Sequence, residues 1–451
     1  MILNSFIARK KIIMVLDGPA VYSKVIKQRS RRLMGLDKIN VDKMNPLHLT
    51  TGTPFMIRME KYLQEYVKIV KNNYKYLKPE FEISPISEVD EGEIKIFKRI
   101  RKYGIKDLSD THLIVGSDAD IILLGLATKP IYNINIYVKY SKFQYIVSIE
   151  KLIIAHSKEM IPKYHLPLVN YKIDDDIFYN IIKLKNDNIR DDFVFVTFML
   201  GNDYINKMKF VKYETLWNAY NETRLSTHGT IIQGTIKETS FFDPRINQAS
   251  LVNRKLINIT FFKEFMTNVN DLLSKKNKKI NKNTYCKNAV SEYISGLLWC
   301  LNMYQTTKCS MYDYIYDCDC PSPADILYYI TTTKNIKFEI PKSDMNPLDV
   351  DIYTLLVMPK KAKKLIPKKY YKYMDNELKH IYRIENCKIC NDYTSQLNKY
   401  KDEYKGIKKK DLPKKIQEKI NKIKFLSNNH IKEHKNDFTL QDIYNINKLK
   451  L

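Results

Sequence analysis

Acidic residues and cysteines are scarce in this chain of 451 residues. The 50 Asp and Glu face 76 Lys and Arg, so the formal net charge at pH 7 is +26. The 7 cysteines are odd in number and none precedes Cys286, which excludes the disulfide framework of a small secreted domain. No uncharged apolar run reaches about 18 residues, and the N-terminus lacks a secretory signal pattern. The sequence predicts an intracellular protein that does not span a membrane, in the cytoplasm, with the nucleus as the alternative.

Glycine and proline are also infrequent, with 12 and 16 copies. With 44% hydrophobic and 12% aromatic residues, the composition excludes a collagen-like, low-complexity or wholly disordered chain. The length suggests two or three domains, or one large domain with an appendage. The excess of Lys and Arg favours a polyanionic partner, because cations that neutralise phosphates release condensed counterions. Nucleic acid is the leading candidate, an anionic membrane is the weaker one, and codon bias could produce the same lysine excess.

Short apolar runs alternate with helical patterns in the first half of the chain. The runs that we interpret as buried strands are Lys11–Asp17, Thr111–Ser117, Ile131–Tyr137 and Phe143–Ile149. The helical patterns in this half are Ser23–Leu36, Thr53–Tyr76, Ile121–Leu126 and Asp191–Leu200. This alternation predicts an α/β fold with a mostly parallel central sheet flanked by helices.

Helical patterns dominate beyond Tyr213. They cover Thr260–Leu273, Cys286–Tyr304 and Asp349–Leu365, and we expect the last to end before Pro367. From Lys405 the composition becomes strongly Lys-rich, which predicts a solvated helix or a partly disordered arm. We therefore expect a mainly helical C-terminal region after the α/β region.

Six acidic residues stand where a predicted strand or helix meets a loop. They are Asp17, Glu91, Glu93, Asp118, Asp120 and Asp203. Groups at the carboxyl ends of parallel strands converge on one crevice of the sheet. Two Mg²⁺ ions about 4 Å apart need several carboxylates of this kind. The cluster predicts a two-metal site for phosphodiester cleavage, although each acid alone is also explained as a helix cap or a turn residue.

A basic segment follows Asp17 within the first predicted helix. Lys24, Gln28, Arg31 and Arg32 stand at positions i, i+4, i+7 and i+8, which share one helical face. Guanidinium groups donate to phosphate oxygens in a fixed fork, so this face is suited to a terminal phosphate. The alternatives are a solvated basic face and a run that resembles a nuclear-localisation signal.

Seven segments resemble, in the same order, blocks of the XRN family of 5′→3′ exoribonucleases. They are DGPAVYSKVIKQRSRR, LTTGTPFM, EVDEGEIKI, SDADIILLGLA, VTFMLGNDYI, YISGLLWCLNMYQ and LLVMPKKAKKLIPKKY. The resemblance implies a PIN- or FEN-like nuclease core that uses two Mg²⁺ ions, with Mn²⁺ as an alternative. It implies an enzyme that removes nucleotides one at a time from the 5′ end of single-stranded RNA bearing a 5′-monophosphate.

The resemblance also assigns residues and regions. The six acids match the metal ligands of the family, and Lys24, Gln28, Arg31 and Arg32 match its 5′-phosphate pocket. Residues 1–212 then correspond to the nuclease core, residues 213–385 to the helical second conserved region, and residues 386–451 to a Lys-rich tail. The family's eukaryotic members are longer, so we expect a short form, and the AT-biased composition suggests a viral source.

The chain departs from the family pattern in three places. The N-terminal strand that carries a further catalytic Asp and a base-stacking His has no counterpart, so we expect an N-terminally truncated core. The segment SMYDYIYDCDCPSPADI has Met311 and Asp313 where Trp is usual, which leaves Tyr312 or Tyr314 to stack on a base. In the EVDEGEIKI block, Asp90 replaces the usual Gly and Ile94 the usual His.

Two other functions stay open from the sequence. The first is an RNA-binding protein of the same family without catalytic activity, which the six acids disfavour because an abandoned site has no reason to keep them. The second is a flap-type DNA nuclease, which the absence of glycine between Gly201 and Gly229 disfavours. A zinc site at the pairs Cys318-x-Cys320 and Cys387-x-x-Cys390 is not expected, because the pairs stand far apart and no His-bearing finger pattern accompanies them.

Overall fold

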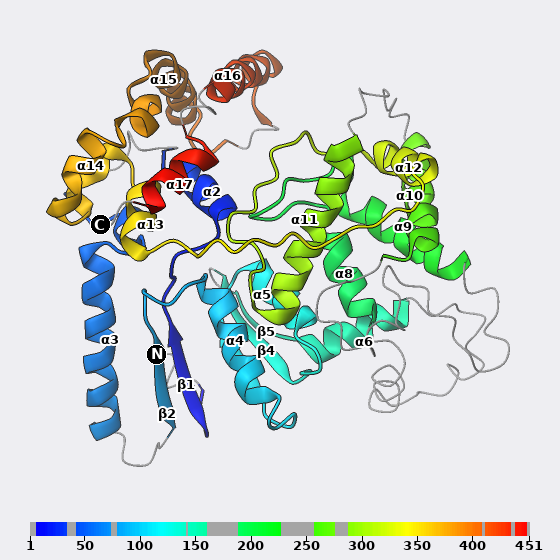
Figure 1. Cartoon of the computed structure of the whole chain (residues 1–451), viewed down its shortest axis with the longest axis horizontal. Coiled ribbons are helices and arrows are strands. Elements are labelled where there is room, and N and C mark those ends of the chain that lie inside the picture. The colour runs from blue at the N-terminus through cyan, green and yellow to red at the C-terminus, as the bar shows by residue number, and fades with distance from the viewer. Residues whose placement is uncertain are drawn as a thin grey trace. The chain divides into compact units, whose positions relative to one another are not determined.

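The computed structural model divides the chain into two compact units (Figure 1). The first unit comprises Met1–Glu91 and Asn346–Leu451, and the second comprises Gly92–Met345. The structure describes residues 6–33, 42–73, 79–140, 143–159, 188–226, 257–275, 287–407, 411–433 and 438–448. None of the helices in these ranges is long and apolar enough to span a membrane.

The sheet of the first unit is a parallel pair, β1 (Lys11–Val15) and β2 (Glu80–Ser84). The sequence predicted β1 but not β2, which carries Glu80 and Glu82 among its five residues. The register explains these charges, because Lys11 lies opposite Glu80 and its Nζ is 2.9 Å from the Glu80 carboxylate. This cross-strand ion pair stabilises the pairing of the charged strand β2 with β1.

The helices of the first unit come from both ends of the chain. They are α2 (Tyr22–Leu33), η2 (Pro46–Leu49), α3 (Pro54–Asn73), α13 (Val350–Val357), η5 (Lys360–Leu365), η6 (Lys368–Tyr370), α14 (Tyr371–Asp375), η7 (Lys379–Asn386), α15 (Lys388–Glu403), α16 (Lys414–Glu433) and α17 (Leu440–Asn447). Arg29 of α2 is 4% exposed and donates to the carbonyls of Leu356 and Ile381, at 2.7 and 2.6 Å. Its guanidinium also lies over the ring of Tyr382. A helix from the N-terminal part of the chain is thereby anchored to the C-terminal part.

The single helix expected over Asp349–Leu365 is two helices in the structure. Helix α13 ends at Val357, and η5 begins at Lys360. Pro359 lies between them, lacks an N–H donor, and favours the extended conformation that Met358 adopts. In the Lys-rich tail, the described residues form the helices α15, α16 and α17. Helix α17 differs from the solvated helix that we expected, because its residues Ile443 and Ile446 are buried.

The sheet of the second unit has three strands in the order β3 (His112–Val115), β4 (Ile134–Tyr140) and β5 (Phe143–Ser148). Strands β3 and β4 are parallel, and β4 and β5 are antiparallel. All three strands were predicted. The single, mostly parallel central sheet was not found, because the described residues form two small sheets, of two and three strands. The fold is a mixed α/β fold rich in helices.

Helices make up most of the second unit. They are α4 (Gly92–Gly104), α5 (Ala119–Ala127), α6 (Ile149–Glu159), α8 (Asn188–Phe198), α9 (Tyr213–Ser226), α10 (Ile259–Ser274), α11 (Lys287–Thr306) and α12 (Pro323–Thr332). Helix α11 contacts α5, α8 and α12, and its residues Leu297–Leu301 are fully buried. The core of this unit therefore surrounds α11. Helices α5 and α8, which precede loops with candidate acids or follow them, pack against α11.

Candidate functional site

The loops after β1 and β2 are joined in the first unit. The Gly18 N–H donates to the Asp90 carbonyl, and the Asp90 N–H donates to the Pro19 carbonyl, both at 3.0 Å. Asp90 has a φ of +89°, in the left-handed region that favours glycine. This conformation gives a physical reason for the usual Gly at this position. The two hydrogen bonds hold Asp17 and Glu91 on neighbouring loops.

The ammonium group of Lys24 pairs with Glu91. Its Nζ is 2.5 Å from Glu91 Oε1, and the two side chains are only 11% and 12% exposed. The sequence assigned Lys24 to a phosphate pocket and Glu91 to a metal site. The structure brings the two residues together, so that the positive and negative parts of the candidate site adjoin.

Tyr353 of α13 joins Gln28 and Arg32 of α2. The Tyr353 hydroxyl donates to Gln28 Oε1 at 2.7 Å. Burial raises the pKa of Tyr353, and the charges of Glu91 and Asp17 raise it further, against the opposing effects of Arg32 and Gln28. Tyr353 therefore stays protonated and donates its hydrogen bond. The sequence patterns did not identify this residue.

Arg32 carries a buried donor that lacks a partner. Burial lowers the pKa of Arg32, and the neighbouring Tyr353 and Asp17 raise it. Its Nε is buried and makes no hydrogen bond within the part of the chain that the structure describes. Burying a guanidinium N–H of this kind costs free energy unless an acceptor forms a hydrogen bond with it. By contrast Arg31, which the sequence placed on the same face, is exposed.

The turn before α3 forms a hydrogen bond with the backbone of Asp17. The Thr51 hydroxyl donates to the Asp17 carbonyl at 2.9 Å, and the Thr354 hydroxyl donates to the Thr51 carbonyl at 2.7 Å. Between them Gly52 has a φ of +85°, and a Cβ there would overlap the Thr354 hydroxyl and a methyl group of Val350. The TTG sequence is therefore required by the backbone that carries Asp17.

Asp118 and Asp120 stand at the N-terminus of α5 in the second unit. Asp118 is the N-cap residue, and its carboxylate accepts from the Asp120 N–H at 3.2 Å. Asp118 is exposed and Asp120 is half-buried in the first turn of the helix. The partial positive charge of a helix N-terminus stabilises carboxylates placed there. Two acids can therefore adjoin at this end of α5 at a reduced electrostatic cost.

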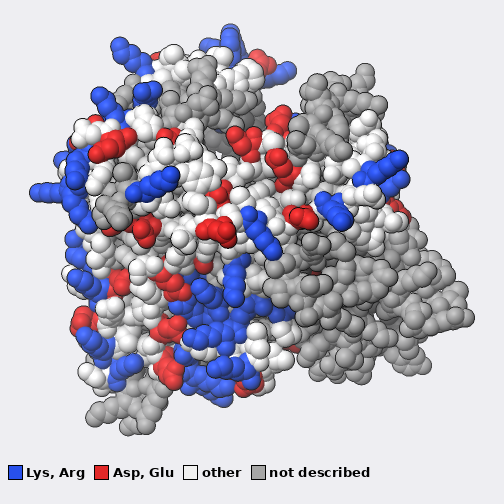
Figure 2. All heavy atoms as spheres, viewed as in Figure 1, with Lys and Arg blue, Asp and Glu red and all other residues white. Residues whose placement is uncertain are grey.

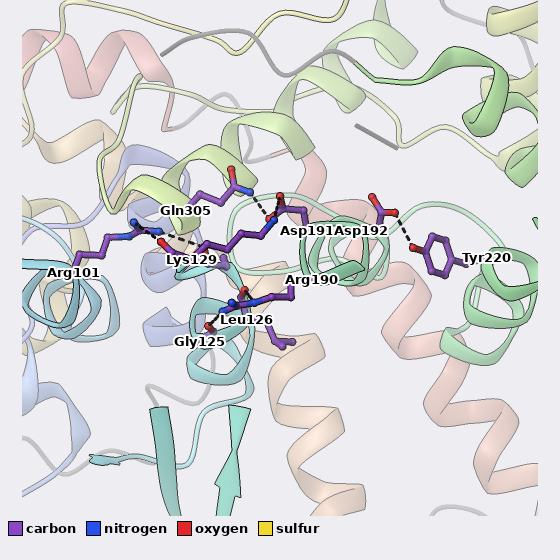
Figure 3. Close-up of polar contacts among 10 residues, drawn as sticks. Arg101, Gly125, Leu126, Lys129, Arg190, Asp191, Asp192, Tyr220 and Gln305 are labelled. Atoms are coloured by element: carbon purple, nitrogen blue, oxygen red, sulfur yellow. Dashed lines mark hydrogen bonds and ion pairs between the residues drawn. The ribbon is translucent and has the colours of Figure 1, made fainter. Parts of the chain in front are cut away.

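The opposite end of α5 is held by two arginines (Figure 3). Arg190 is 1% exposed and donates to the carbonyls of Leu126 and Gly125, at 2.7 and 3.0 Å. Arg101 donates to the Ala127 carbonyl at 3.3 Å. These groups satisfy the last carbonyls of the helix and place positive charge at its negative end. They fix the position of α5 and, with it, that of its acidic N-terminus.

Two acids that follow Arg190 in α8 are structural. Asp191 pairs with Lys129, whose Nζ lies 2.9 Å from the carboxylate, and also accepts from Gln305 of α11. Asp192 is fully buried and accepts from the Tyr220 hydroxyl at 2.7 Å. Figure 3 shows that both carboxylates point to these partners. They connect α8 to its neighbours and are separate from the six candidate acids.

Asp203 lies in a tight turn after α8. Gly201 has a φ of +85°, and the Asn202 side chain accepts from the Tyr204 and Ile205 N–H groups, at 2.9 and 2.8 Å. Asn202 also donates to Cys300 Sγ at 3.6 Å. Burial raises the pKa of Cys300, and the Asp120 charge contributes in the same direction. The thiol of Cys300 is therefore close to both Asn202 and Asp120.

Glu93 lies in the first turn of α4, which is basic on its outer face. Lys98 and Lys102 of this helix, and Lys106 in the turn just after its end at Gly104, are exposed and recur every four positions. We call these three residues the α4 lysine face, and Figure 2 shows Lys and Arg gathered over this helix. The second unit holds four candidate acids, Glu93, Asp118, Asp120 and Asp203. Among its described residues no three carboxylates bring oxygen atoms within 4.8 Å of one another.

The structure separates the two candidate stacking residues. Tyr314 is 7% exposed, its ring lies 4.8 Å from that of Trp299, and its hydroxyl donates to the Glu292 carbonyl. Because Tyr314 is a core residue, its ring is not available to a base. Tyr312 is half-buried and stays a candidate. Asp313, at a position where the family usually has Trp, is buried and accepts from the Ser343 hydroxyl.

Two known protein families match this chain. Residues 36–137 match the family described as XRN 5'-3' exonuclease N-terminus, and residues 271–420 match the one described as Xrn1 helical domain. Together the matches cover more than half of the chain. The first match includes Glu91, Glu93, Asp118 and Asp120, which are four of the candidate acids. The candidate residues of α2 precede it.

Three similar proteins extend this result. The 5'-3' exoribonuclease 1 of Saccharomyces cerevisiae is 25% identical over 315 residues, or 62% of this chain and 20% of the yeast protein. Human 5'-3' exoribonuclease 1 is 27% identical over 222 residues, or 44% of this chain and 13% of the human protein. A protein of Acanthamoeba polyphaga mimivirus, named as a predicted 5'-3' exonuclease, is 26% identical over 193 residues, or 39% of this chain and 28% of the viral protein. The aligned part is less than a third of each relative.

Proposed function

Because this chain belongs to the XRN family of 5′→3′ exonucleases, we propose that it is a Mg²⁺-dependent exoribonuclease. Its substrate in this proposal is single-stranded RNA with a 5′-monophosphate, which it degrades from the 5′ end in the cytoplasm. The family match supports the class of enzyme.

The chemistry of the six candidate acids fits a hard divalent cation. All six donors are carboxylates, and none of them is fully buried. Mg²⁺ prefers oxygen ligands and keeps several of its waters, which suits acids that stand on loops and helix ends. Asp17, Glu91, Glu93, Asp118, Asp120 and Asp203 would hold the metal. When bound, it would lower the pKa of a water molecule and neutralise the leaving oxygen.

The observation that carries the substrate proposal is the buried Arg32 Nε. It is a donor without a hydrogen-bond partner among the described residues, beside the ion pair of Lys24 and the amide of Gln28. A terminal phosphate monoester offers three acceptor oxygens and about two negative charges, which match these donors. A 5′-hydroxyl offers neither. The pocket would therefore position the 5′ end of the RNA, while the acids act on the bond that follows.

The residues of this chain then have distinct roles. Lys24, Gln28 and Arg32 bind and orient the terminal phosphate, and Tyr353 holds the Gln28 amide in place. The α4 lysine face offers a surface for the phosphates of the strand. Each hydrolysis would break the bond between the phosphorus and the 3′-oxygen of the terminal nucleotide. Water supplies the new oxygen on that phosphorus, a nucleoside 5′-monophosphate leaves, and the shortened strand carries a new 5′-monophosphate that the same pocket can bind. This recurrence supports stepwise removal of nucleotides.

The test is degradation of one RNA sequence with three different 5′ ends by the purified 451-residue chain in Mg²⁺. We expect the 5′-monophosphate RNA to be degraded, and the 5′-triphosphate and 5′-hydroxyl RNAs to persist. The double variant Asp118→Ala/Asp120→Ala should lose about a hundredfold to a thousandfold in rate, as expected when charge stabilisation at a reacting phosphate is removed, yet should still bind RNA.

One control variant separates a specific loss of activity from a general effect of substitution. The variant Asp392→Ala removes an exposed carboxylate of α15 and should leave the rate unchanged. Unchanged decay in the double variant would refute the assignment of these acids. If the wild-type chain binds 5′-monophosphate RNA without degrading it, the enzyme proposal fails and the RNA-binding alternative holds.

A further inference from the structure

Two cysteines and one histidine meet at the junction of α15 and α16 in the first unit. Cys387 is the N-cap residue of α15 and makes no side-chain capping hydrogen bond, and Cys390 lies one turn later. His430 comes from α16, which packs against α15. The Cys387 Sγ lies 3.2 Å from His430 Nε2, and the three ligand atoms are all within 4.8 Å of one another. No other group of three His, Cys, Asp or Glu within the described residues is this close.

These distances match the requirements of a zinc ion. With Zn–S of about 2.3 Å and Zn–N of about 2.0 to 2.1 Å, tetrahedral geometry places two sulfurs about 3.8 Å apart, and a sulfur and a nitrogen about 3.6 Å apart. The observed separations differ from these values by amounts that side-chain rotation can supply. Two soft sulfur ligands and an imidazole select zinc over hard cations such as Mg²⁺.

The positions of the ligands also favour binding. Two cysteines separated by two residues at the start of a helix share one face, and the positive end of the helix favours their anionic form. All three side chains are half-buried, so an ion can reach them while the surrounding protein shields it. Cys300 differs on this point, because it is fully buried beside Asn202 and acts as a core residue.

From the sequence we did not expect a zinc site at Cys387 and Cys390. The spacing of Cys387 and Cys390 is a weak signal alone, and His430 stands 43 positions after Cys387. The structure supplies the missing observation, because it brings the histidine from a second helix to the cysteine pair. The pair Cys318 and Cys320 has no such histidine in its surroundings within the described residues.

We propose that Cys387, Cys390 and His430 bind one Zn²⁺ ion that joins α15 to α16. The described residues supply three ligands, which leaves one position for a water molecule or a further side chain. The ion links the start of one helix to the later part of the next. Its role is structural, and it is independent of the Mg²⁺-binding acids proposed above.

The first experiment measures zinc in the full chain. The protein is expressed in zinc-supplemented medium and purified under reducing conditions. Its metal content is determined by inductively coupled plasma mass spectrometry. We expect about one Zn²⁺ per chain. A chain that contains no zinc, and that fails to compete for Zn²⁺ with a chromogenic chelator at micromolar concentration, would overturn the proposal.

Variants and a spectroscopic probe identify the ligands. Cys387→Ser, Cys390→Ser and His430→Ala should each lose the bound zinc, whereas Cys318→Ser, a half-buried cysteine outside the group, should keep it. Equal loss in Cys318→Ser would contradict the assignment. In the wild-type chain, Co²⁺ should give the intense near-ultraviolet bands of thiolate coordination and the visible bands of a tetrahedral site.

The cobalt spectrum does not depend on how well a variant folds. A Co²⁺ spectrum without thiolate bands would therefore refute the site even if the variants were insoluble. A mass two units below that of the dithiol would show a Cys387–Cys390 disulfide instead, and would equally refute it. Because none of these measurements uses RNA, failure of the zinc proposal is distinguishable from failure of the exoribonuclease proposal.

Discussion

Arg32 combines a positive charge with a buried donor that has no protein partner among the described residues. In the proposed complex this donor binds the terminal phosphate, and a hydrogen bond to a charged group contributes about 1.5 to 3 kcal/mol. We expect Arg32→Lys to raise KM for 5′-monophosphate RNA about tenfold to a hundredfold, with a smaller effect on kcat. Lysine keeps the charge but lacks the fork geometry.

Steady-state kinetics on 5′-monophosphate RNA measures this effect, with Arg58→Lys on the exposed face of α3 as the control. An unchanged KM in Arg32→Lys would remove Arg32 from the phosphate pocket. A fall in kcat alone would instead assign it a role after binding.

The candidate residues of α2 share one helical face, so their spacing was visible in the sequence. Tyr353 was not visible, because it lies 325 positions from Gln28, with which it forms a hydrogen bond. The pattern also placed Arg31 with the other basic residues, yet the structure leaves it exposed. Periodicity gives the face of a helix, but which part of that face is covered depends on elements that are distant in the sequence.

At the scale of the element, the turn around Gly52 is a test of stability. Gly52→Ala forces a side chain into the left-handed region and into the Thr354 hydroxyl. Gly406 has a φ of +92° but no atom within 4 Å of a Cβ placed there. We expect Gly406→Ala to lower the free energy of unfolding by about 1 kcal/mol, and Gly52→Ala by about 2 to 4 kcal/mol.

Urea unfolding of the two variants, monitored by circular dichroism, gives the comparison. Both variants place alanine at a positive φ, so the difference between their free energies of unfolding gives the cost of the steric overlap at Gly52. If the two variants are equally stable, the packing of Thr354 against the turn is not as tight as the structure indicates.

The N-terminus of α17 predicts a dependence of stability on pH. Burial raises the pKa of Asp442, but hydrogen bonds from the Thr439 N–H, from His380 and from the Thr439 hydroxyl outweigh it, and the net pKa lies below the usual range. A lowered pKa contributes stability above the unfolded value of about 3.9, and this contribution is lost as the pH falls through the folded value.

We therefore expect Asp442→Asn to be less stable than the wild type above about pH 5, by about 1 kcal/mol, because Asn lacks the negative charge that interacts with His380 and with the N-terminus of α17. The difference should shrink as the pH falls below about 4. Thermal unfolding between pH 3 and pH 7 measures it, with Asp392→Asn on the exposed face of α15 as the control. A difference that grows towards acid pH would contradict the lowered pKa.

The elements that the sequence predicted are those with a clear apolar pattern. The strands β1, β3, β4 and β5 and the helices α2, α3, α10 and α11 were found close to their expected places, whereas α4, α9 and α15 were not predicted. Strand β2 was missed because the alternation of Glu80 and Glu82 with Phe81 and Ile83 covers only five residues, too few to stand out as a strand pattern. Its parallel pairing with β1 and the ion pair of Glu80 with Lys11 are seen only in the structure. The break at Pro359 followed from local chemistry that the longer apolar pattern concealed.

At the scale of the whole molecule, the charge of +26 predicts a strong effect of salt on RNA binding. The logarithm of the binding constant for a single strand falls by about 0.7 for each phosphate contact when plotted against the logarithm of the salt concentration. We expect the triple variant Lys98→Gln/Lys102→Gln/Lys106→Gln to reduce this slope by about 2, because it removes the α4 lysine face.

Binding of fluorescent single-stranded RNA to the Asp118→Ala/Asp120→Ala background, measured between 50 and 300 mM salt, gives the slope without degradation. The control Lys61→Gln/Lys68→Gln/Lys71→Gln removes the same charge from exposed positions of α3. Equal slopes for the two triple variants would mean that RNA responds to the net charge and not to the α4 lysine face.

The first unit is built from two segments at opposite ends of the chain, and this affects how the protein folds during synthesis. Arg29 is anchored to the Leu356 carbonyl, 327 positions further along the chain. At about 5 to 20 residues per second, roughly 15 to 65 seconds pass on the ribosome before that partner has been made. The second unit, Gly92–Met345, is one continuous segment, so all of it has been synthesised before the first unit is complete. Newly made α2 must wait for its partners with its apolar side exposed, so factors that shield nascent chains should affect the yield of this protein more through its first thirty residues than through its middle.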